Sequence, residues 1–331
     1  MDTMKAAYIE KTGTVDQIVY GDLPKPKPTG AQALVQVKAV SVNPIDTYIR
    51  AGTVAMELPK PFILGCDLAG VVESVGPEAK RLKAGDRVWG SNQGLLGRQG
   101  TFAQFAAVDE QWLYPIPEEV SFEDAAAIAL VALTAHLGLF RDAQLKMGEK
   151  VFVHGGSGGV SSCVVQMARA VGARVMTTAG NDEKVQICRK LGANVVVNYR
   201  TGNIEDALTR FGDVDVWWEN LRDPNFERAI NHLAFRGRII VMAGREAKPA
   251  FPIGPFYTRD ARLYGFAMFN SPPEEQRKAA AEINRWLARG KLGPQIDRVM
   301  KLSEAAEAHK LQETSTLGKK SSLAGKIVLV P

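Results

Sequence analysis

The chain has 331 residues, of which 46% are hydrophobic and 23% are charged, and its formal net charge at pH 7 is +5. This length and composition indicate an ordinary globular protein of two domains and exclude a disordered chain. The basic residues are scattered, apart from the small cluster Lys319 and Lys320, so we do not expect nucleic acid as a partner.

The cysteines and the apolar segments exclude further classes of protein. Cys66, Cys163 and Cys188 are widely spaced and form no C-x-x-C pair, so they indicate neither a disulfide framework nor a zinc cluster. The first residues contain no apolar signal-peptide core, and the longest apolar run, residues 125–140, is shorter than a membrane span. We therefore expect a cytoplasmic protein without membrane insertion, in which this run is a buried helix.

The first third of the chain alternates short strands with turn residues. Residues 33–40 alternate apolar and polar side chains at period two, and residues 70–76 and 86–90 continue this pattern between glycines and prolines. Strands of this length and spacing predict a small β-barrel-like domain. Residues 121–124 have the spacing of a capping box and predict the start of the helix over residues 125–140.

Residues 151–162 predict a strand, a glycine-rich turn and the start of a helix. In the pattern G-x-G-x-x-G, Gly156 and Gly158 occupy the first two positions, and Ser161 replaces the third glycine. Gly156 permits the tight turn, Gly158 lets the backbone approach a pyrophosphate, and the third position needs a small residue for helix packing. Phosphates also bind the free N–H groups at a helix N-terminus. We therefore predict a dinucleotide site that also includes Ser157, Gly159 and Val160.

Strands and helices alternate after this turn, which is typical of a parallel, doubly wound sheet. Strands are predicted over residues 173–179, 193–199, 213–218, 237–244 and 262–269, and helices over residues 162–171, 183–191, 203–211 and 225–233. Helices over 272–289 and 303–311 and a strand over 325–331 return the chain to the first domain. We predict an α/β protein whose doubly wound domain covers residues 125–267 and whose β-rich domain combines residues 1–124 and 268–331.

The end of the second strand of the doubly wound domain indicates which dinucleotide binds. A site that prefers NAD usually has an acidic residue there to bind the ribose hydroxyls, and this chain has Ala179. Gly180, Asn181 and Lys184 leave space, a donor and a cation for a 2′-phosphate, and Tyr199 ends the next strand at the same edge. We therefore predict NADPH as the cofactor.

This order of parts resembles the medium-chain dehydrogenase/reductase superfamily over essentially the whole chain. The motifs at residues 42–52, 63–72, 83–89 and 154–160 are similar to those of its quinone oxidoreductase, or zeta-crystallin-like, branch. The resemblance implies a GroES-like catalytic domain beside a Rossmann domain. It also implies hydride transfer to a small electrophilic acceptor, a quinone or an α,β-unsaturated carbonyl, and a homodimer or homotetramer.

The resemblance also allows the zinc ligands of the superfamily's alcohol dehydrogenases to be compared position by position. The ligand cysteine falls at Asn43, the ligand histidine falls at Cys66, and the acidic neighbour falls at Asp67. Residues 90–100 replace the lobe that would hold structural zinc, and they contain no cysteine. We therefore expect no metal.

Candidate catalytic and nicotinamide-binding residues follow from the resemblance. Asn43, Asp46 and Tyr48 belong to the segment that faces the nicotinamide in the family, although Asn43 and Asp46 could equally cap a turn and Tyr48 could pack. Further cofactor contacts are implied at Thr134, Gly244, Arg245, Phe266, Ala267 and Met268.

Two segments depart from the family pattern and keep other hypotheses open. Trp217, Trp218 and Glu219 replace the usual ending of the fourth strand, and we expect one tryptophan to face each side of the sheet. Lys319–Leu323 is a small insertion without a functional explanation. The alternatives to a quinone or enone reductase are an enoyl-thioester reductase and a non-catalytic nucleotide-binding protein, crystallin-like or RNA-binding.

Overall fold

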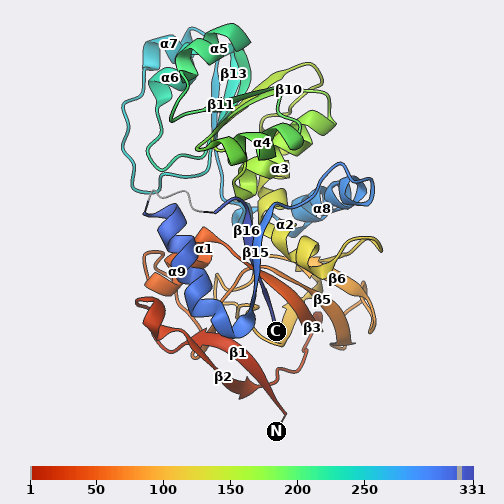
Figure 1. Cartoon of the computed structure of the whole chain (residues 1–331). Coiled ribbons are helices and arrows are strands. Elements are labelled where there is room, and N and C mark those ends of the chain that lie inside the picture. Colours follow the sequence, from red (N-terminus) through yellow and green to blue (C-terminus); the bar gives the residue numbers. More distant parts are fainter. Residues whose placement is uncertain (1, 319–322) are drawn as a thin grey trace. The chain divides into compact units, whose positions relative to one another are not determined.

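The computed structural model describes residues 2–318 and 323–331, so most of the Lys319–Leu323 insertion lies outside the described residues. The chain forms two compact units (Figure 1). Unit 1 combines Met1–Val131 with Pro273–Pro331, and unit 2 is Ala132–Pro272.

Unit 1 is rich in β-structure. Its strands are β1 (Thr3–Ile9), β2 (Val19–Pro24), β3 (Gln32–Val42), β4 (Phe62–Ile63), β5 (Leu68–Val75), β6 (Arg87–Gly90), β7 (Phe105–Asp109), β8 (Leu113–Pro115), β15 (Ile296–Lys301) and β16 (Lys326–Val330). They form a sheet of order β2-β1-β4 and a larger sheet of order β15-β16-β3-β5-β6-β8, in which β7 also pairs with β3. Because the long β3 pairs with β5, β7 and β16, the C-terminal strand is fixed beside the N-terminal part of the chain.

The helices of unit 1 include one that the sequence analysis missed. They are α1 (Pro44–Ala51), the first part of α2 (Phe122–His136), whose last residues belong to unit 2, α8 (Pro273–Ala288) and α9 (Ala305–Thr316). Single turns are η1 (Val15–Gln17), η2 (Glu110–Trp112) and η5 (Leu302–Glu304). No helix was predicted for the segment that forms α1, but Pro44 at its first position, a capping box at its start and Gly52 at its end delimit one. Helices α1 and α9 pack side by side (Figure 1).

Helix α2 is the buried helix predicted from the apolar run. It continues as a π-helical stretch, η3 (Leu137–Asp142). Among the described residues, this 21-residue helix is the one that is long and apolar enough to cross a membrane, and 78% of its most apolar window is buried in the protein. A core helix of a globular domain has these properties.

Unit 2 contains the predicted doubly wound sheet, and this prediction of the fold is confirmed. Its parallel strands are β9 (Lys150–Val153), β10 (Arg174–Ala179), β11 (Val195–Asn198), β12 (Val214–Glu219), β13 (Leu233–Val241) and β14 (Arg262–Gly265), in the order β11-β10-β9-β12-β13-β14. The helices are α3 (Gly159–Ala170), α4 (Asp182–Lys190), α5 (Ile204–Phe211), α6 (Phe226–Asn231) and α7 (Ile253–Tyr257), with the single turn η4 (Met268–Asn270). The strand order reverses at β9, and ligands of such sheets bind beyond the carboxyl ends of the strands at this switch point.

The two tryptophans of β12 lie on opposite faces of the sheet, as expected from strand alternation. Trp217 packs against Phe152 at 4.2 Å between ring centroids, in the core beneath α5 and α6. Trp218 faces Gly138 of η3, where an added Cβ would lie 2.5 Å from the indole ring. Both side chains are fully buried, so the departure at the end of β12 is accommodated by the core.

Several predicted element boundaries were wrong. Helix α3 begins at Gly159, three residues earlier than predicted, since the glycine-rich segment itself forms the first helical turn. Strand β13 ends at Val241 and β14 ends at Gly265, so the loops that follow them begin earlier than expected. Strand β15 was not predicted.

Candidate functional site

The glycine-rich turn links β9 to α3 at the switch point of the sheet. The tight turn was predicted at Gly156, but the residue with a left-handed backbone is Gly155, whose φ is +60°. Gly156 is needed for a different reason, because an added Cβ would lie 2.5 Å from Thr177 Oγ1 of β10. The turn therefore runs too close to the neighbouring strand to carry a side chain at this position.

Ser161, at the third glycine position, connects three elements. Its Oγ donates to the carbonyl oxygen of His154 at 2.9 Å and accepts from Asn220 Nδ2 at 2.6 Å. His154 follows β9 and Asn220 follows β12, so this buried hydroxyl fixes the start of α3 against the ends of both strands. A serine thus provides the small volume that the position needs and adds hydrogen bonds that a glycine lacks.

The start of α3 can bind an anion. Gly158 is the N-cap residue, and the helix continues for 12 residues. The first N–H groups of a helix have no partner within it and carry its positive dipole end, so the backbone of Gly159, Val160 and Ser161 presents donors to a phosphate. Gly158 and the half-buried Gly159 add no side chain that would block a ligand there.

The carboxyl ends of β10 and β11 bring together four residues that are separate in sequence. Asn181 caps α4 by accepting from the Lys184 N–H at 2.8 Å, and Lys184 is 7% exposed. The Tyr199 hydroxyl lies over Gly180, where an added Cβ would approach it within 2.5 Å. Gly180, Asn181, Lys184 and Tyr199 therefore share one edge of the sheet, as the sequence analysis expected.

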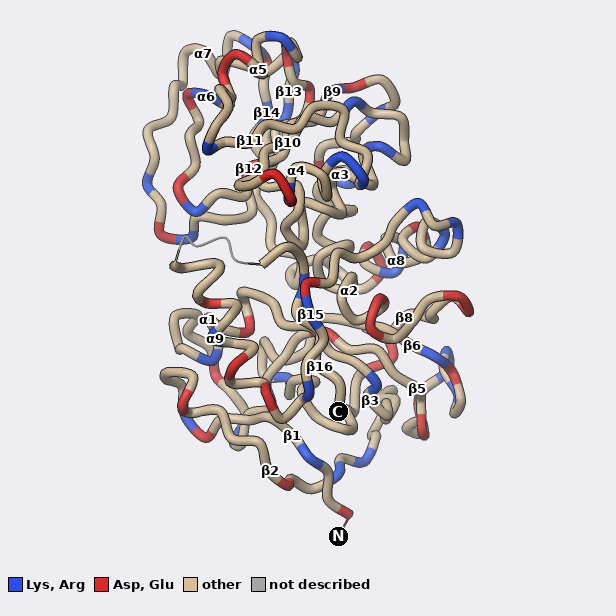
Figure 2. Tube along the Cα trace, in the orientation of Figure 1, with Lys and Arg blue, Asp and Glu red and all other residues tan. Residues whose placement is uncertain are grey.

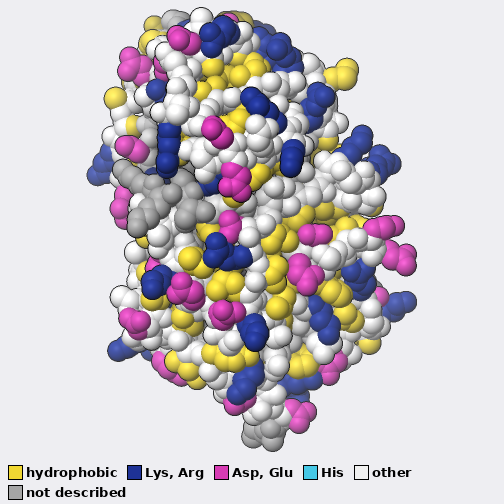
Figure 3. All heavy atoms as spheres, viewed as in Figure 1, with side chains coloured by type: hydrophobic (Ala, Val, Ile, Leu, Met, Phe, Trp, Pro, Cys, Tyr) yellow, Lys and Arg dark blue, Asp and Glu magenta, His cyan; other side chains and the backbone are white. Residues whose placement is uncertain are grey.

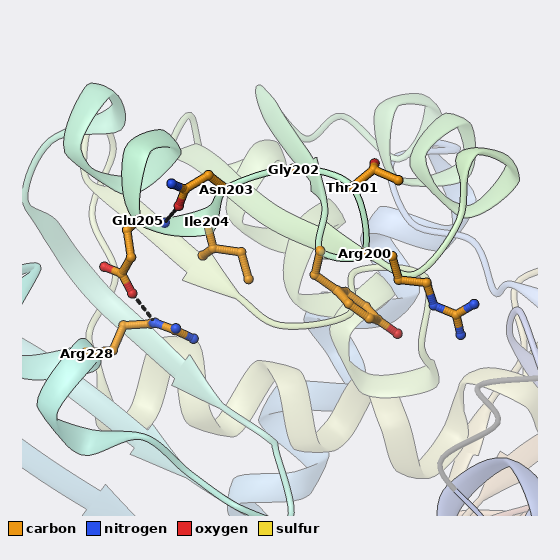
Figure 4. Close-up of a pocket in the computed structure, with 8 residues that line it drawn as sticks. Arg200, Thr201, Gly202, Asn203, Ile204, Glu205 and Arg228 are labelled. Carbon is orange, nitrogen blue, oxygen red and sulfur yellow. Dashed lines mark hydrogen bonds and ion pairs between the residues drawn. The ribbon is translucent and has the colours of Figure 1, made fainter.

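An acidic residue, Asp182, also lies at this edge, and a pocket lies beside it. Asp182 accepts from Asn198 Nδ2 at 2.9 Å. An open pocket of about 470 Å³ is lined by Tyr199, Arg200, Thr201, Gly202, Asn203, Ile204, Glu205 and Arg228 (Figure 4). Arg228 donates to Glu205 at 2.5 Å, so the charge of this arginine is neutralised within the pocket.

The residues expected around the nicotinamide occupy other parts of unit 2. Thr134 is buried in α2, and Met268 is buried in η4. Phe266 follows β14, together with Ala267, and its ring lies under Arg141, 5.1 Å from the guanidinium carbon. Gly244 and the exposed Arg245 lie in the loop after β13 and do not end this strand as predicted.

In unit 1, Asn43 and Asp46 form the start of α1. The Asn43 N–H donates to Asp46 Oδ2 at 2.7 Å, which closes the capping box. Asn43 and Asp46 are buried, whereas Tyr48, in the next turn of the same helix, is partly exposed. Of the three residues predicted to be catalytic, Tyr48 is therefore the one that has a surface to offer a substrate.

A buried polar cluster surrounds Asn43, and one of its members was missed by the sequence analysis. Lys326 Nζ donates to Asn43 Oδ1 and, at 2.7 Å, to the Val42 carbonyl. Asn43 Nδ2 donates to Asp67 Oδ2 at 2.8 Å, and Ser41 Oγ donates to the same oxygen at 2.9 Å. The only sequence feature that could have indicated this role of Lys326 is its position as a single charged residue at the start of the apolar strand Lys326–Val330.

Burial sets the protonation of this cluster. It raises the pKa of Asp46 to about 7, against the opposing effects of Cys66 and Lys326, and it also raises the pKa of Asp67. The pKa of the Cys66 thiol is raised well above its ordinary value by burial and by the carboxylates of Asp46 and Asp67. Cys66 is therefore a neutral thiol, which is neither a nucleophile nor a good metal ligand.

Charged side chains of both signs are interspersed in the described part of the chain. Acidic and basic residues follow one another along the chain (Figure 2), and the face in Figure 3 carries basic side chains interspersed with acidic ones. Within residues 2–318 and 323–331, no group of three or more His, Cys, Asp or Glu side chains is arranged to hold a metal ion.

Comparisons with known proteins match both parts of the chain. A family model described as "Alcohol dehydrogenase GroES-like domain" matches residues 29–118, and one described as "Zinc-binding dehydrogenase" matches residues 159–285. The quinone oxidoreductase of Pongo abelii is 36% identical over 314 residues, which cover 93% of this chain and 92% of the relative. The 2-methylene-furan-3-one reductase of Solanum lycopersicum is 33% identical over 75% of this chain and 64% of its own length.

Solved structures agree with these sequence matches. Escherichia coli quinone oxidoreductase complexed with NADPH is 27% identical and superposes with a TM-score of 0.85, covering 99% of this chain and 100% of that chain. An alcohol dehydrogenase superfamily protein from Novosphingobium aromaticivorans is 31% identical, with a TM-score of 0.87 and the same coverage.

Proposed function

Because the chain belongs to the quinone oxidoreductase branch of the medium-chain dehydrogenase/reductase superfamily and is an oxidoreductase, we propose that it uses NADPH to reduce a quinone or an α,β-unsaturated carbonyl. The observation that carries this proposal is the carboxyl edge of the sheet in unit 2. There the glycine turn before α3 hydrogen-bonds to Thr178 near the end of β10, Gly180 and Lys184 follow this strand, and no acidic residue ends it.

The residues of this edge fit the phosphates of NADPH. The backbone from Gly156 to Val160, including Ser157, would hold the pyrophosphate. Lys184, Asn181 and Tyr199 would hold the 2′-phosphate, which an acidic residue in place of Ala179 would repel. The remaining assigned contacts, to the nicotinamide half, are Thr134, Gly244, Arg245, Phe266, Ala267 and Met268.

Bound NADPH supplies a hydride, which with one proton converts a quinone to a hydroquinone or an enone to a saturated carbonyl. The protein must orient the acceptor and stabilise the negative charge that develops on its oxygen. We assign the donor for this oxygen to the Tyr48 hydroxyl. Asn43 and Asp46, whose side chains are buried and hydrogen-bonded at the start of α1, position the helix that carries Tyr48.

The same cluster supports catalysis without zinc. A zinc site needs at least three ligand side chains, and the positions compared above contain the amide of Asn43 and the neutral thiol of Cys66. The ammonium group of Lys326 is hydrogen-bonded to Asn43, and its positive charge would repel a metal cation. The acceptor must therefore already be electron-poor, as quinones and enones are.

An acceptor panel tests this proposal. NADPH oxidation is measured with a para-quinone, an ortho-quinone, an acyclic enone and a simple ketone, for the wild type and for Tyr48→Phe. We expect turnover with at least one quinone or enone, none with the ketone, and a loss of about 100-fold in kcat for Tyr48→Phe. Turnover of the simple ketone alone would refute the proposal.

Enone reduction is a second candidate because one relative carries the name 2-methylene-furan-3-one reductase. The panel separates it from quinone reduction by the ratio of kcat/KM values for the two acceptor types. Cofactor binding without turnover of any acceptor would instead favour the non-catalytic alternative.

We also propose a homodimer or homotetramer. The edge strand β14 and the neighbouring α7 expose large apolar side chains, namely Ile253 (70%), Tyr257 (66%) and Leu263 (44%). Light scattering after size-exclusion chromatography measures the mass, and a strict monomer at micromolar concentration would contradict this proposal.

A further inference from the structure

The C-terminal strand brings a lysine into the interior of unit 1. Strand β16 pairs antiparallel with β3, with Ile327 opposite Val42, so Lys326 lies opposite Asn43 at the point where β3 leads into α1. Lys326 is 5% exposed, and the next three residues of its strand are fully buried and apolar. A buried ammonium group is costly unless it is paired, so its contacts call for an explanation beyond packing.

The contacts of Lys326 fix the orientation of the Asn43 side chain. An ammonium group can only donate hydrogen bonds, and a carboxylate can only accept them. Because Lys326 Nζ contacts one end of the Asn43 amide and Asp67 Oδ2 contacts the other, the oxygen must face Lys326 and the NH₂ group must face Asp67. The assignment of the two amide atoms is therefore determined by the charges on either side.

The same lysine also holds the backbone at the start of α1. Its Nζ donates to the Val42 carbonyl at 2.7 Å, one residue before the N-cap Asn43. It also acts electrostatically on both buried carboxylates, lowering the pKa of Asp46 and that of Asp67 against the effect of burial. Its three effects, on the amide, on the backbone and on the carboxylates, converge on the first turn of the helix that carries Tyr48.

We propose that Lys326 is a positioning residue for the reduction, a built-in cation that orients Asn43 and thereby fixes the N-terminus of α1 and the Tyr48 hydroxyl. This inference rests on the proposed function and adds to it a residue from the opposite end of the chain. Without the ammonium group, the Asn43 oxygen loses its donor, and Asp46 and Asp67 are left in one buried cluster without a cation. The carboxylates then take up protons or the turn shifts, and a displacement of about 1 Å is enough to slow catalysis strongly.

The test compares two replacements of similar length. Lys326→Met removes every donor, whereas Lys326→Gln retains a neutral N–H donor for the Asn43 oxygen. Lys38→Met is the matched control, since Lys38 is an exposed lysine of β3. For each variant, kcat with the best acceptor, the Kd for NADPH and the folded fraction by circular dichroism are measured.

For Lys326→Met we expect kcat per folded molecule to fall about 30-fold, with the Kd for NADPH changed by less than about twofold. In Lys326→Gln, kcat is expected to recover to within about fivefold of the wild type, and Lys38→Met should match the wild type. A folded Lys326→Met with wild-type kcat, or Gln and Met variants with equal losses per folded molecule, would overturn the positioning role.

Failure of the proposed function gives a different result. A wild type that turns over none of the acceptors refutes the reductase assignment. The role of Lys326 at the helix start is then tested by amide hydrogen exchange of the segment Pro44–Ala51, and unchanged exchange in Lys326→Met would overturn it.

Discussion

The glycine turn of unit 2 and the polar cluster of unit 1 are built in opposite ways. The turn uses backbone N–H groups, and Gly156 keeps a side chain out of the way of the neighbouring strand. The cluster relies mainly on side chains, those of Ser41, Asn43, Asp46, Asp67 and Lys326, which hydrogen-bond to one another and to the backbone at the start of α1.

The two regions should therefore respond differently to substitutions. The turn presents its donors outward and can bind a charged ligand. Substitutions there should lower stability through steric overlap or should weaken cofactor binding. The cluster is closed to solvent, so changes there should act on protonation and on the position of α1.

The largest effect is expected when volume is added to the turn. In Gly156→Ala, the new Cβ would lie 2.5 Å from Thr177 Oγ1 and 3.0 Å from Cys188 Sγ, so we expect the free energy of unfolding to fall by about 3 kcal/mol. Denaturant titration measures this loss. Gly254→Ala is the control because no atom lies within 4 Å of its added Cβ, and equal stability of the two variants would contradict the steric role of Gly156.

A smaller effect is expected when a charge is removed from the same edge. Lys184→Ala should weaken NADPH binding by about 2 kcal/mol, roughly 30-fold, because a charge-assisted hydrogen bond to the 2′-phosphate is lost. NADH lacks this phosphate, so its Kd should change little. Equilibrium titration with both coenzymes checks this prediction, and equal losses for NADPH and NADH would remove Lys184 from phosphate recognition.

The buried side of unit 1 is tested through pH. His309 is fully buried, and neither of its ring nitrogens has a hydrogen-bond partner among residues 2–318 and 323–331. Burial together with the charge of Arg50 lowers its pKa to about 3. The unfolded chain therefore binds more protons between about pH 6.5 and pH 3, so the contribution of His309 to stability is lost as the pH falls through this window.

Replacing His309 should make the protein more resistant to acid. Between about pH 7 and pH 5.5, the wild type should lose about 1 kcal/mol more of its free energy of unfolding than His309→Leu. Urea titrations at the two pH values measure the difference. Identical acid sensitivity of the two proteins would show that His309 is protonated in the folded state.

No effect on activity is expected when metal ions are removed. Because a lysine ammonium group lies beside Asn43, incubation with EDTA or phenanthroline should leave kcat and KM unchanged. A zinc alcohol dehydrogenase treated in parallel is the control. If the chelator abolished activity and added zinc restored it, the zinc-independent mechanism would be refuted. The cluster would then be open to a metal ion.

The sequence predicted the turn better than the cluster for a physical reason. Gly156, Gly158 and Ser161 lie within six residues, and their spacing follows from the local geometry of a strand, a turn and a helix. Lys326 contacts Asn43 across 283 residues, through a strand pairing that no local pattern reveals. The sequence could still predict that Tyr199 and Gly180 lie at the same edge of the sheet, because parallel neighbouring strands end at a common edge.

The missed helix α1 illustrates the same limit at short range. Asn43 and Pro44 are typical of turns, and the eight residues that follow Asn43 are few for a helix. What stabilises the helix is tertiary, namely its packing against α9 and the hydrogen bonds that the N-cap residue Asn43 donates to Asp67 and accepts from Lys326. Asn43 and Asp46, which were predicted to be catalytic, both take part in these buried contacts at the start of α1.

The most direct test of this account is an equilibrium titration of the wild-type protein with NADPH and NADH, followed by coenzyme fluorescence. We predict saturable binding of one NADPH per chain, at least about 10-fold tighter than NADH, because Lys184 and Tyr199 lie at an edge where no acidic residue ends β10. Binding of neither coenzyme, or tighter binding of NADH, would contradict it.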